Sequence, residues 1–456
     1  MNGNTQPLRA TRLALLWPPT AAIAIYLLCR PLLDEPQAQL IAVVALLVVW
    51  WTNEALPLGV VSLLPLLLFP AFAVAPMSAV AVHFANPMIF LFLGGFMLAI
   101  AVEKSSLHQQ IAFRLMQLFP ATVKGTLFAL TLTSALLSGL LSNTTVALLL
   151  MPLALFLSDD ATIRPRLALG IAYGASIGGI TTPIGTPPNL IMLGFLQQHE
   201  LAAIPFARWI ALVLPLSLTM LFVVTGLLGF GLGNRRLSAP AAPRVLDGAQ
   251  RRLLFVLAAL LLILLLNAPI EPYYAGLGLD ERAILLAFGL SMFVPGFGIL
   301  VWQDSRRIPF EIVFLFGAGF SIAGAFTSTG LSAAIGSELL QVTQLSPWLL
   351  VLLIAALVTF TTEITSNTAL ISMMLPVVYA MCTSAGLDTS LLLMVATICA
   401  SYAFMLPIAT PPNAIAVGSG KVRPQLMLRL GLAMNLASIL LISLCALYYW
   451  RPMLAA

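Results

Sequence analysis

Apolar runs of membrane-spanning length recur along the whole of this 456-residue chain. Residues 40–49, 257–266 and 437–447 are three of them, and many of these runs extend further. A hydrocarbon core needs about 20 apolar residues per helix, and the chain offers roughly ten to twelve such segments. The strict alternation of apolar and polar residues that marks a membrane barrel is missing. The sequence therefore predicts an all-α polytopic membrane protein.

Composition excludes a soluble domain. Hydrophobic residues make up 61% of the chain and charged residues only 8%, whereas soluble domains carry about a quarter charged residues. The net charge of +5 does not indicate a nucleic-acid partner, because the basic residues are spread over loops between apolar runs. The apolar stretch 13–29 is longer than the core of a signal peptide, so we expect an uncleaved first span.

The chain also matches itself at one fixed offset. Ser-Asn-Thr stands at 142–144 and again at 366–368, and Thr-Pro-Pro-Asn stands at 186–189 and again at 410–413. Both pairs are 224 residues apart (366 − 142 and 410 − 186). Several matches at one offset are typical of an internal duplication.

The distribution of Lys and Arg predicts the orientation of the spans. With a cytoplasmic N-terminus, 17 of the 21 basic residues fall on the cytoplasmic side, as the positive-inside rule requires. The exceptions are Arg30, Arg208, Arg282 and Arg451. The eleven spans behind this count are 13–29, 38–51, 57–75, 86–103, 167–198, 207–233, 251–268, 281–300, 310–327, 389–420 and 426–450. We expect a multi-pass protein of the inner (plasma) membrane.

Two apolar stretches, 125–157 and 348–380, remain outside these spans. Each carries Ser-Asn-Thr near its middle, where a continuous span does not accommodate three polar residues, and each is long enough for a re-entrant hairpin of two half-length helices. Lys124 flanks the first hairpin and Asp388 the second, so we expect them to enter from opposite sides. Eleven spans with such hairpins predict two inverted repeats.

Two of the spans, 167–198 and 389–420, contain the Thr-Pro-Pro-Asn motif. Adjacent prolines end a helix, but proline is favoured in the first turn of a new one, so Thr186 and Thr410 are predicted N-caps of restarting half-helices. Together with the hairpins, four helix N-termini then converge near the midplane. Exposed carbonyl, hydroxyl and amide oxygens suit Na⁺, and helix N-termini suit a carboxylate.

These doubled motifs resemble those of the divalent anion/sodium symporter family, which carries dicarboxylates, citrate and sulfate. Residues 51–57, Trp-Thr-Asn-Glu-Ala-Leu-Pro, are similar to an early Trp-x-x-Glu-Ala-x-Pro segment of that family. Asn53 departs from the Thr or Ser that the family often has, in a segment expected to lie away from the substrate loops. The resemblance covers nearly the whole chain and implies a homodimer in which a transport part moves as an elevator against a scaffold.

The resemblance also implies the domains and the binding residues. The scaffold would comprise 1–124 and 251–347, the transport part 125–234 and 348–456, and the cytoplasmic linker 235–250. The implied substrate-binding residues are Ser142, Asn143, Thr144, Thr186, Ser366, Asn367, Thr368, Thr410 and Pro411. The first implied sodium site has Ser138, Ser142, Asn143 and Gly185, and the second has Thr362, Thr365, Asn367 and Ala409.

Glu54 and Glu363 stand in apolar surroundings, and an intramembrane carboxyl is a functional candidate. Glu363 precedes Ser366 by three residues. It either organises the hairpin tip, carries a coupled proton, or is a carboxylate bonded to backbone at a helix break.

The leading hypothesis is sodium-coupled symport of a di- or tricarboxylate such as succinate, malate, fumarate or citrate. The alternatives within the class are a sodium-independent dicarboxylate/citrate exchanger and a sodium-coupled sulfate transporter. A channel is disfavoured, because inverted hairpins with broken helices make two gates. Motifs of membrane-embedded enzymes are not apparent, and no organic cofactor is indicated.

Overall fold

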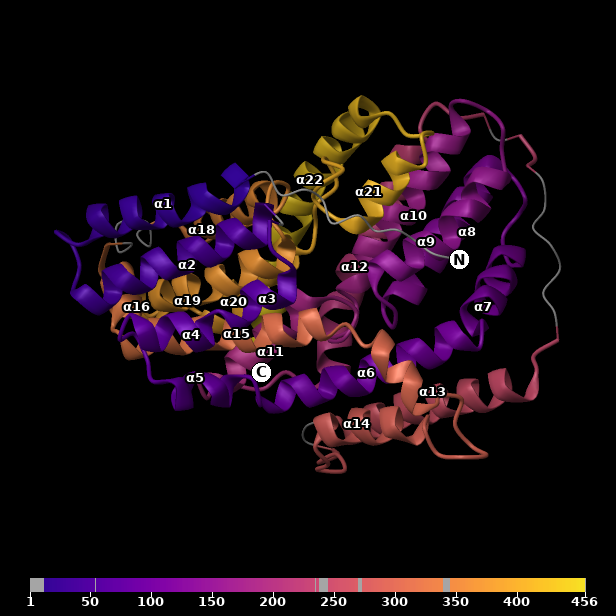
Figure 1. Ribbon diagram of the computed structural model, residues 1–456. Coiled ribbons are helices and arrows are strands. Elements are labelled where there is room, and N and C mark those ends of the chain that lie inside the picture. The colour runs from indigo at the N-terminus through magenta and orange to yellow at the C-terminus, as the bar shows by residue number, and fades with distance from the viewer. Residues whose placement is uncertain are drawn as a thin grey trace.

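The computed structural model describes residues 12–53, 55–233, 235–237, 245–269, 273–338 and 345–455. Within these residues the chain is nearly all-helical (Figure 1), which confirms the predicted fold class at that level. Seven of the described helical segments are long and apolar enough to cross a membrane. They are Glu35–Asn53, Met77–Lys104, Phe206–Gly229, Gly248–Asn267, Phe310–Ser328, Asn367–Ala385 and Pro424–Leu454.

The first half of the chain forms twelve helices in the described residues. They are α1 (Arg12–Cys29), α2 (Glu35–Asn53), α3 (Leu58–Leu63), α4 (Pro65–Ala71), α5 (Met77–His83), α6 (Pro87–Lys104), α7 (Leu107–Gln117), α8 (Val123–Ser138), α9 (Asn143–Phe156), α10 (Ile163–Gly179), α11 (Pro187–Gln198) and α12 (Phe206–Gly229). The predicted span 57–75 is divided between α3 and α4, which begins at Pro65.

The second half repeats much of this order. Its described elements are α13 (Gly248–Asn267), α14 (Glu281–Ser291), η1 (Trp302–Arg307), α15 (Phe310–Ser328), α16 (Leu331–Glu338), α18 (Pro347–Thr361), α19 (Asn367–Ala385), α20 (Thr389–Ala400), α21 (Pro411–Gly418), α22 (Pro424–Cys445), η2 (Ala446–Trp450) and α23 (Arg451–Ala455). The predicted span 281–300 is helical only as far as Ser291. The chain then folds back at Pro295 and Gly296. Proline does not continue a helix, and Gly296 has a φ of +80°.

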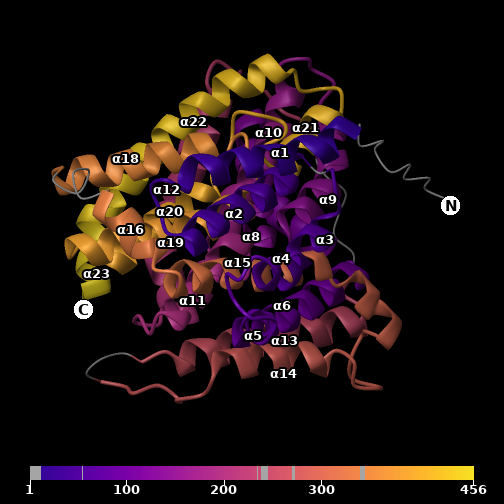
Figure 2. The same ribbon diagram turned by 60° about the vertical axis from the view of Figure 1, so that its left-hand side comes forward.

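Buried apolar side chains form two clusters. The larger one joins α6 and the helices α8–α12 to α13, α18–α20 and α22. The smaller one packs α2, α3 and α4 against α15. Helices α13 and α14 lie beside α6 along one edge of the molecule in both views (Figures 1 and 2), and α14 packs against α6. The approach is close, because a Cβ added at Gly94 would lie 2.3 Å from the carbonyl oxygen of Leu285.

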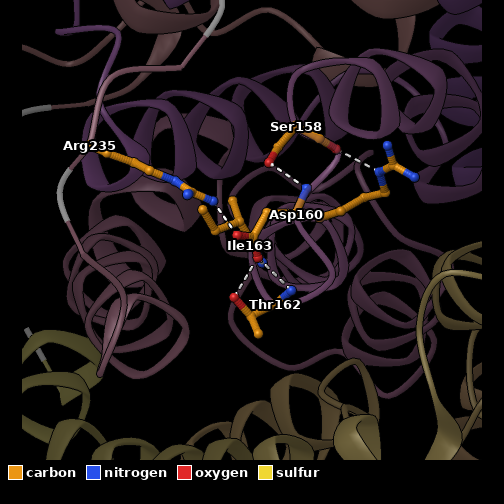
Figure 3. Close-up of polar contacts among 6 residues, drawn as sticks. Ser158, Asp160, Thr162, Ile163 and Arg235 are labelled. Carbon is orange, nitrogen blue, oxygen red and sulfur yellow. Dashed lines mark hydrogen bonds and ion pairs between the residues drawn. The ribbon is translucent and has the colours of Figure 1, made fainter.

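The loop between α9 and α10 is fastened to a segment far away in sequence. Asp160 Oδ1 accepts hydrogen bonds from the hydroxyl of Thr162 at 2.6 Å and from the backbone N–H groups of Thr162 and Ile163, and Oδ2 pairs with Arg235 (Figure 3). These hydrogen bonds hold the pKa of the Asp160 carboxyl well below its ordinary value, and the bond from the Thr162 hydroxyl has the largest effect.

The backbone of the same segment pairs with the start of α8. Val123 N–H donates to the carbonyl of Arg235 at 3.0 Å, and Leu237 N–H donates to the carbonyl of Ala121 at 2.9 Å. Residues 235–237 therefore link the start of α8 to the loop that precedes α10.

Candidate functional site

Two pairs of helices break at the Ser-Asn-Thr tripeptides. Helix α8 ends at Ser138 and α9 begins at Asn143, with the Ser142 hydroxyl accepting from Thr145 N–H at 3.2 Å. In the second half α18 ends at Thr361 and α19 begins at Asn367. Each tripeptide thus begins a helix whose first N–H groups have no partner within that helix.

The Thr-Pro-Pro-Asn motifs begin two further helices. Helix α10 ends at Gly179 and α11 begins at Pro187, while α20 ends at Ala400 and α21 begins at Pro411. Thr410 is the N-cap of α21, as predicted, and its hydroxyl accepts a hydrogen bond from Asn413 N–H at 3.4 Å. Thr186 is the N-cap residue of α11, as predicted, although its side chain makes no capping hydrogen bond.

The asparagine that ends each motif holds the helix break together. Asn189 Nδ2 donates to the carbonyls of Gly179 and Thr182 at 3.2 and 2.8 Å. Asn413 Nδ2 donates to the carbonyls of Ala403 and Leu406 at 3.0 and 3.1 Å. Ala403 and Leu406 stand 224 residues after Gly179 and Thr182, so these contacts repeat at the same offset as the motifs. Sequence reasoning quoted both asparagines in the repeated motif but gave them no role.

Both tripeptides and both breaks open onto one cavity of about 1010 Å³. All nine implied substrate residues line it: Ser142, Asn143, Thr144, Thr186, Ser366, Asn367, Thr368, Thr410 and Pro411. Of the implied sodium ligands, Gly185, Thr365 and Ala409 also line it, whereas Ser138 and Thr362 are fully buried behind the tips. The structure therefore brings the implied site residues of both halves together.

Other lining residues come from segments outside the predicted site. They include Trp50–Asn53, Leu56–Leu58, Phe92, Phe96 and Glu311. The expectation that the Trp-x-x-Glu-Ala-x-Pro segment lies away from the substrate loops is wrong, because both line the same cavity. Asn53 ends α2 here, and its Oδ1 accepts a hydrogen bond from Ala55 N–H at 2.9 Å. Glu54 itself lies outside the described residues.

Oxygen atoms of the first half gather around Gly185. The Ser138 hydroxyl donates to Asn143 Oδ1 at 2.5 Å. A Cβ added at Gly185 would lie 2.4 Å from the carbonyl oxygen of Gly179 and 2.9 Å from that of Ser138. One added at Gly179 would lie 2.7 Å from Asn143 Oδ1. Carbonyl, hydroxyl and amide oxygens packed this closely are the donor set that a hard cation takes.

The second half contains an equivalent hydroxyl–amide pair. The Thr362 hydroxyl is 2.7 Å from Asn367 Oδ1 and 2.8 Å from the carbonyl oxygen of Ala400. Thr362 and Asn367 stand 224 residues after Ser138 and Asn143. Thr365, also implied in the second sodium site, directs its hydroxyl to the carbonyl of Thr361 at 2.9 Å.

Glu363 has no counterpart in the first half, where the equivalent position is Gly139. Its carboxylate is buried and accepts from Phe404 N–H at 2.7 Å, Met405 N–H at 2.9 Å and Leu406 N–H at 2.9 Å. The side-chain amide of Asn435 on α22 donates a fourth bond at 2.7 Å. These are the contacts of a carboxylate that fastens the α18–α19 tip to the α20–α21 break.

Comparison with known proteins gives one consistent result. The family model CitMHS, "Citrate transporter", matches residues 46–396 and 284–455. A "Sodium-dependent dicarboxylate transporter SdcS" of Staphylococcus saprophyticus is 30% identical over 92% of this chain and 88% of its own. One from Staphylococcus aureus is 30% identical over 90% of this chain and 85% of its own.

The fold is also similar to a solved structure. The YdaH transporter of Alcanivorax borkumensis superposes with a TM-score of 0.60, at 14% identity, over 92% of this chain and 99% of that one. This likeness shows the fold alone, that of a multi-pass membrane protein. The doubled motifs meet in one cavity, and the family model and the staphylococcal relatives match most of the length of the chain. The chain therefore belongs to the divalent anion/sodium symporter family.

Proposed function

We propose that this protein is a secondary transporter that carries a C4-dicarboxylate or citrate together with Na⁺. The observation that carries the proposal is the charge of the cavity. Four helices, α9, α11, α19 and α21, begin at it, yet none of its described lining residues is Lys, Arg or His. Helix N-termini supply only partial positive charge, and a dianion that leaves bulk water needs further compensation. Sodium ions bound together with the anion supply the missing positive charge, and this couples the movement of the anion to the movement of sodium.

The site residues are proposed as the resemblance implies them. The carboxylates bind at Ser142–Thr144, Ser366–Thr368 and the starts of α11 and α21. One Na⁺ is held around Asn143 and Gly185 and another around Asn367 and Ala409. The clustered oxygens at Gly185 and the matching Thr362–Asn367 pair support this assignment. The names of the two staphylococcal relatives favour a dicarboxylate over sulfate.

The architecture is proposed on the same grounds. Eleven spans and two re-entrant hairpins form inverted repeats, and residues 125–234 and 348–456 move as an elevator against a dimeric scaffold of 1–124 and 251–347. The contacts repeated at the 224-residue offset support duplication. The protein lies in the inner membrane with its N-terminus in the cytoplasm, as the Lys and Arg distribution favours.

The test is uptake of labelled succinate, citrate and sulfate into proteoliposomes, with and without an inward sodium gradient. We expect sodium-driven succinate or citrate uptake that falls at least about tenfold in Asn143→Ala and in Asn367→Ala, because each removes an amide ligand. Gln109→Ala, an exposed amide on α7, is the control and should transport normally. Counterflow that persists when choline replaces sodium would instead establish exchange. Near-normal sodium-driven uptake by both asparagine variants would refute the site.

A further inference from the structure

Among the described residues that line the cavity, one carries a charged side chain, Glu311 in the first turn of α15. Its side chain is exposed and has no hydrogen-bond or ion-pair partner among the described residues. Glu103 differs, because it pairs with Arg307 outside the cavity. Gly59 of α3 leaves room for Glu311, since a Cβ added there would lie 3.3 Å from Glu311 Cγ.

A free carboxylate in this lining acts on the two cargo species in opposite directions. It attracts a cation that enters the cavity and repels an anion bound at the helix N-termini that line the same cavity. By Coulomb's law in water, two unit charges about 10 Å apart change an affinity roughly twofold, and we take this as the scale of the effect per unit of cargo charge. It therefore grows with anion charge, to roughly fourfold for a dianion and eightfold for a trianion.

We propose that Glu311 is a specificity-determining residue, which raises sodium affinity and lowers anion affinity in proportion to anion charge. The inference rests on the proposed carboxylate transport. It assigns the site a preference for dianions over trianions and gives the bound anion a lower barrier to release. Carboxylate ligands should accordingly rank by charge as well as by shape.

Kinetics of Glu311→Gln in proteoliposomes test this proposal. At saturating sodium we expect the KM to fall roughly twofold for a monoester of succinate, fourfold for succinate and eightfold for a tricarboxylate. The sodium concentration for half-maximal uptake should rise roughly twofold. Added inert salt should shrink all of these shifts, because it screens exposed charges. Glu311→Asp, which keeps the charge, should stay near wild type.

The matched control is Glu338→Gln, which removes the same charge from an exposed position on α16 outside the cavity lining. It should leave every constant unchanged. An unaltered KM in Glu311→Gln would overturn the proposal, and so would an equal shift for all three anions, which indicates an effect on packing rather than charge. Wild-type protein without sodium-driven carboxylate uptake would instead contradict the proposed function, and that measurement comes first.

Discussion

The hydroxyl of Thr362 lies 2.7 Å from Oδ1 of Asn367, so the residue that closes one helix orients the amide that begins the next. The same hydroxyl contacts the Ala400 carbonyl at the end of α20. A hydroxyl, an amide oxygen and a carbonyl thus lie together at the junction of three helices. The hydroxyl needs only to rotate its proton away to present its oxygen to a cation.

Thr362→Val tests whether this hydroxyl serves a sodium site. Valine keeps the shape of the side chain but removes one oxygen and leaves Asn367 without its orienting bond. Since a hydrogen bond contributes about 0.5–1.5 kcal/mol net, we expect the half-saturating sodium concentration to rise about two- to twelvefold. Thr362→Ser, which keeps the hydroxyl, should remain near wild type. Equal sodium dependence in both variants would remove Thr362 from the site.

Gly185→Ala tests the close packing of oxygens in the first half. The added Cβ would lie 2.4 Å from the Gly179 carbonyl oxygen, which real Cβ atoms essentially never show, so the backbone of the break has to shift. We expect sodium-driven uptake to fall by about tenfold or more while the protein still inserts. Gly418→Ala on α21, where a Cβ meets nothing within 4 Å, is the control. Normal uptake by Gly185→Ala would show that this packing is not required.

Much of the site was predictable because it follows from local chemistry that repeats. Polar tripeptides inside apolar stretches and paired prolines inside spans each force a helix to end, and the fixed offset shows that the two halves match. The structure has helix breaks at all four places. Local sequence also predicted Thr410 as an N-cap.

The rest of the cavity lining was not predictable in this way. Glu311 and Trp50–Asn53 reach the cavity through the packing of α2 and α3 against α15, which joins residues more than 200 positions apart. Nothing in the spacing of one sequence records such a contact. The early end of α14 also depends on a fold-back around Gly298, where a Cβ would lie 2.0 Å from the Met292 carbonyl oxygen.

Glu363→Gln tests whether the buried carboxylate organises the break or carries a proton. The carboxylate accepts four N–H bonds, and glutamine turns an N–H of its own toward one of those donors. Leaving a buried donor without a partner costs about 1–3 kcal/mol, so we expect a lower unfolding temperature and weak uptake. The exposed Glu35→Gln is the control.

A protonophore separates the two roles of Glu363 in the wild type. A carboxylate that only positions the break requires no proton movement, so collapsing the proton gradient should leave sodium-driven uptake unchanged. Uptake that depends on that gradient would favour proton coupling through this side chain.

Asp160→Asn tests the link between the α9–α10 loop and Arg235. Because the pKa of Asp160 is lowered in the folded protein, its carboxylate stabilises the fold above the unfolded value of about 3.9, and this contribution is lost as the pH falls through the lower folded value. We expect the variant to unfold at a lower temperature than wild type at pH 7, with a difference that is constant down to about pH 5 and narrows below about pH 4. Fluorescence of the buried Trp209 and Trp450 reports the transition in detergent. Asp159→Asn, which removes a fully exposed carboxylate that pairs with Arg164, should change little at any of these pH values. A difference that persists unchanged at pH 3 would show that Asp160 acts through the shape of the loop and not through its charge.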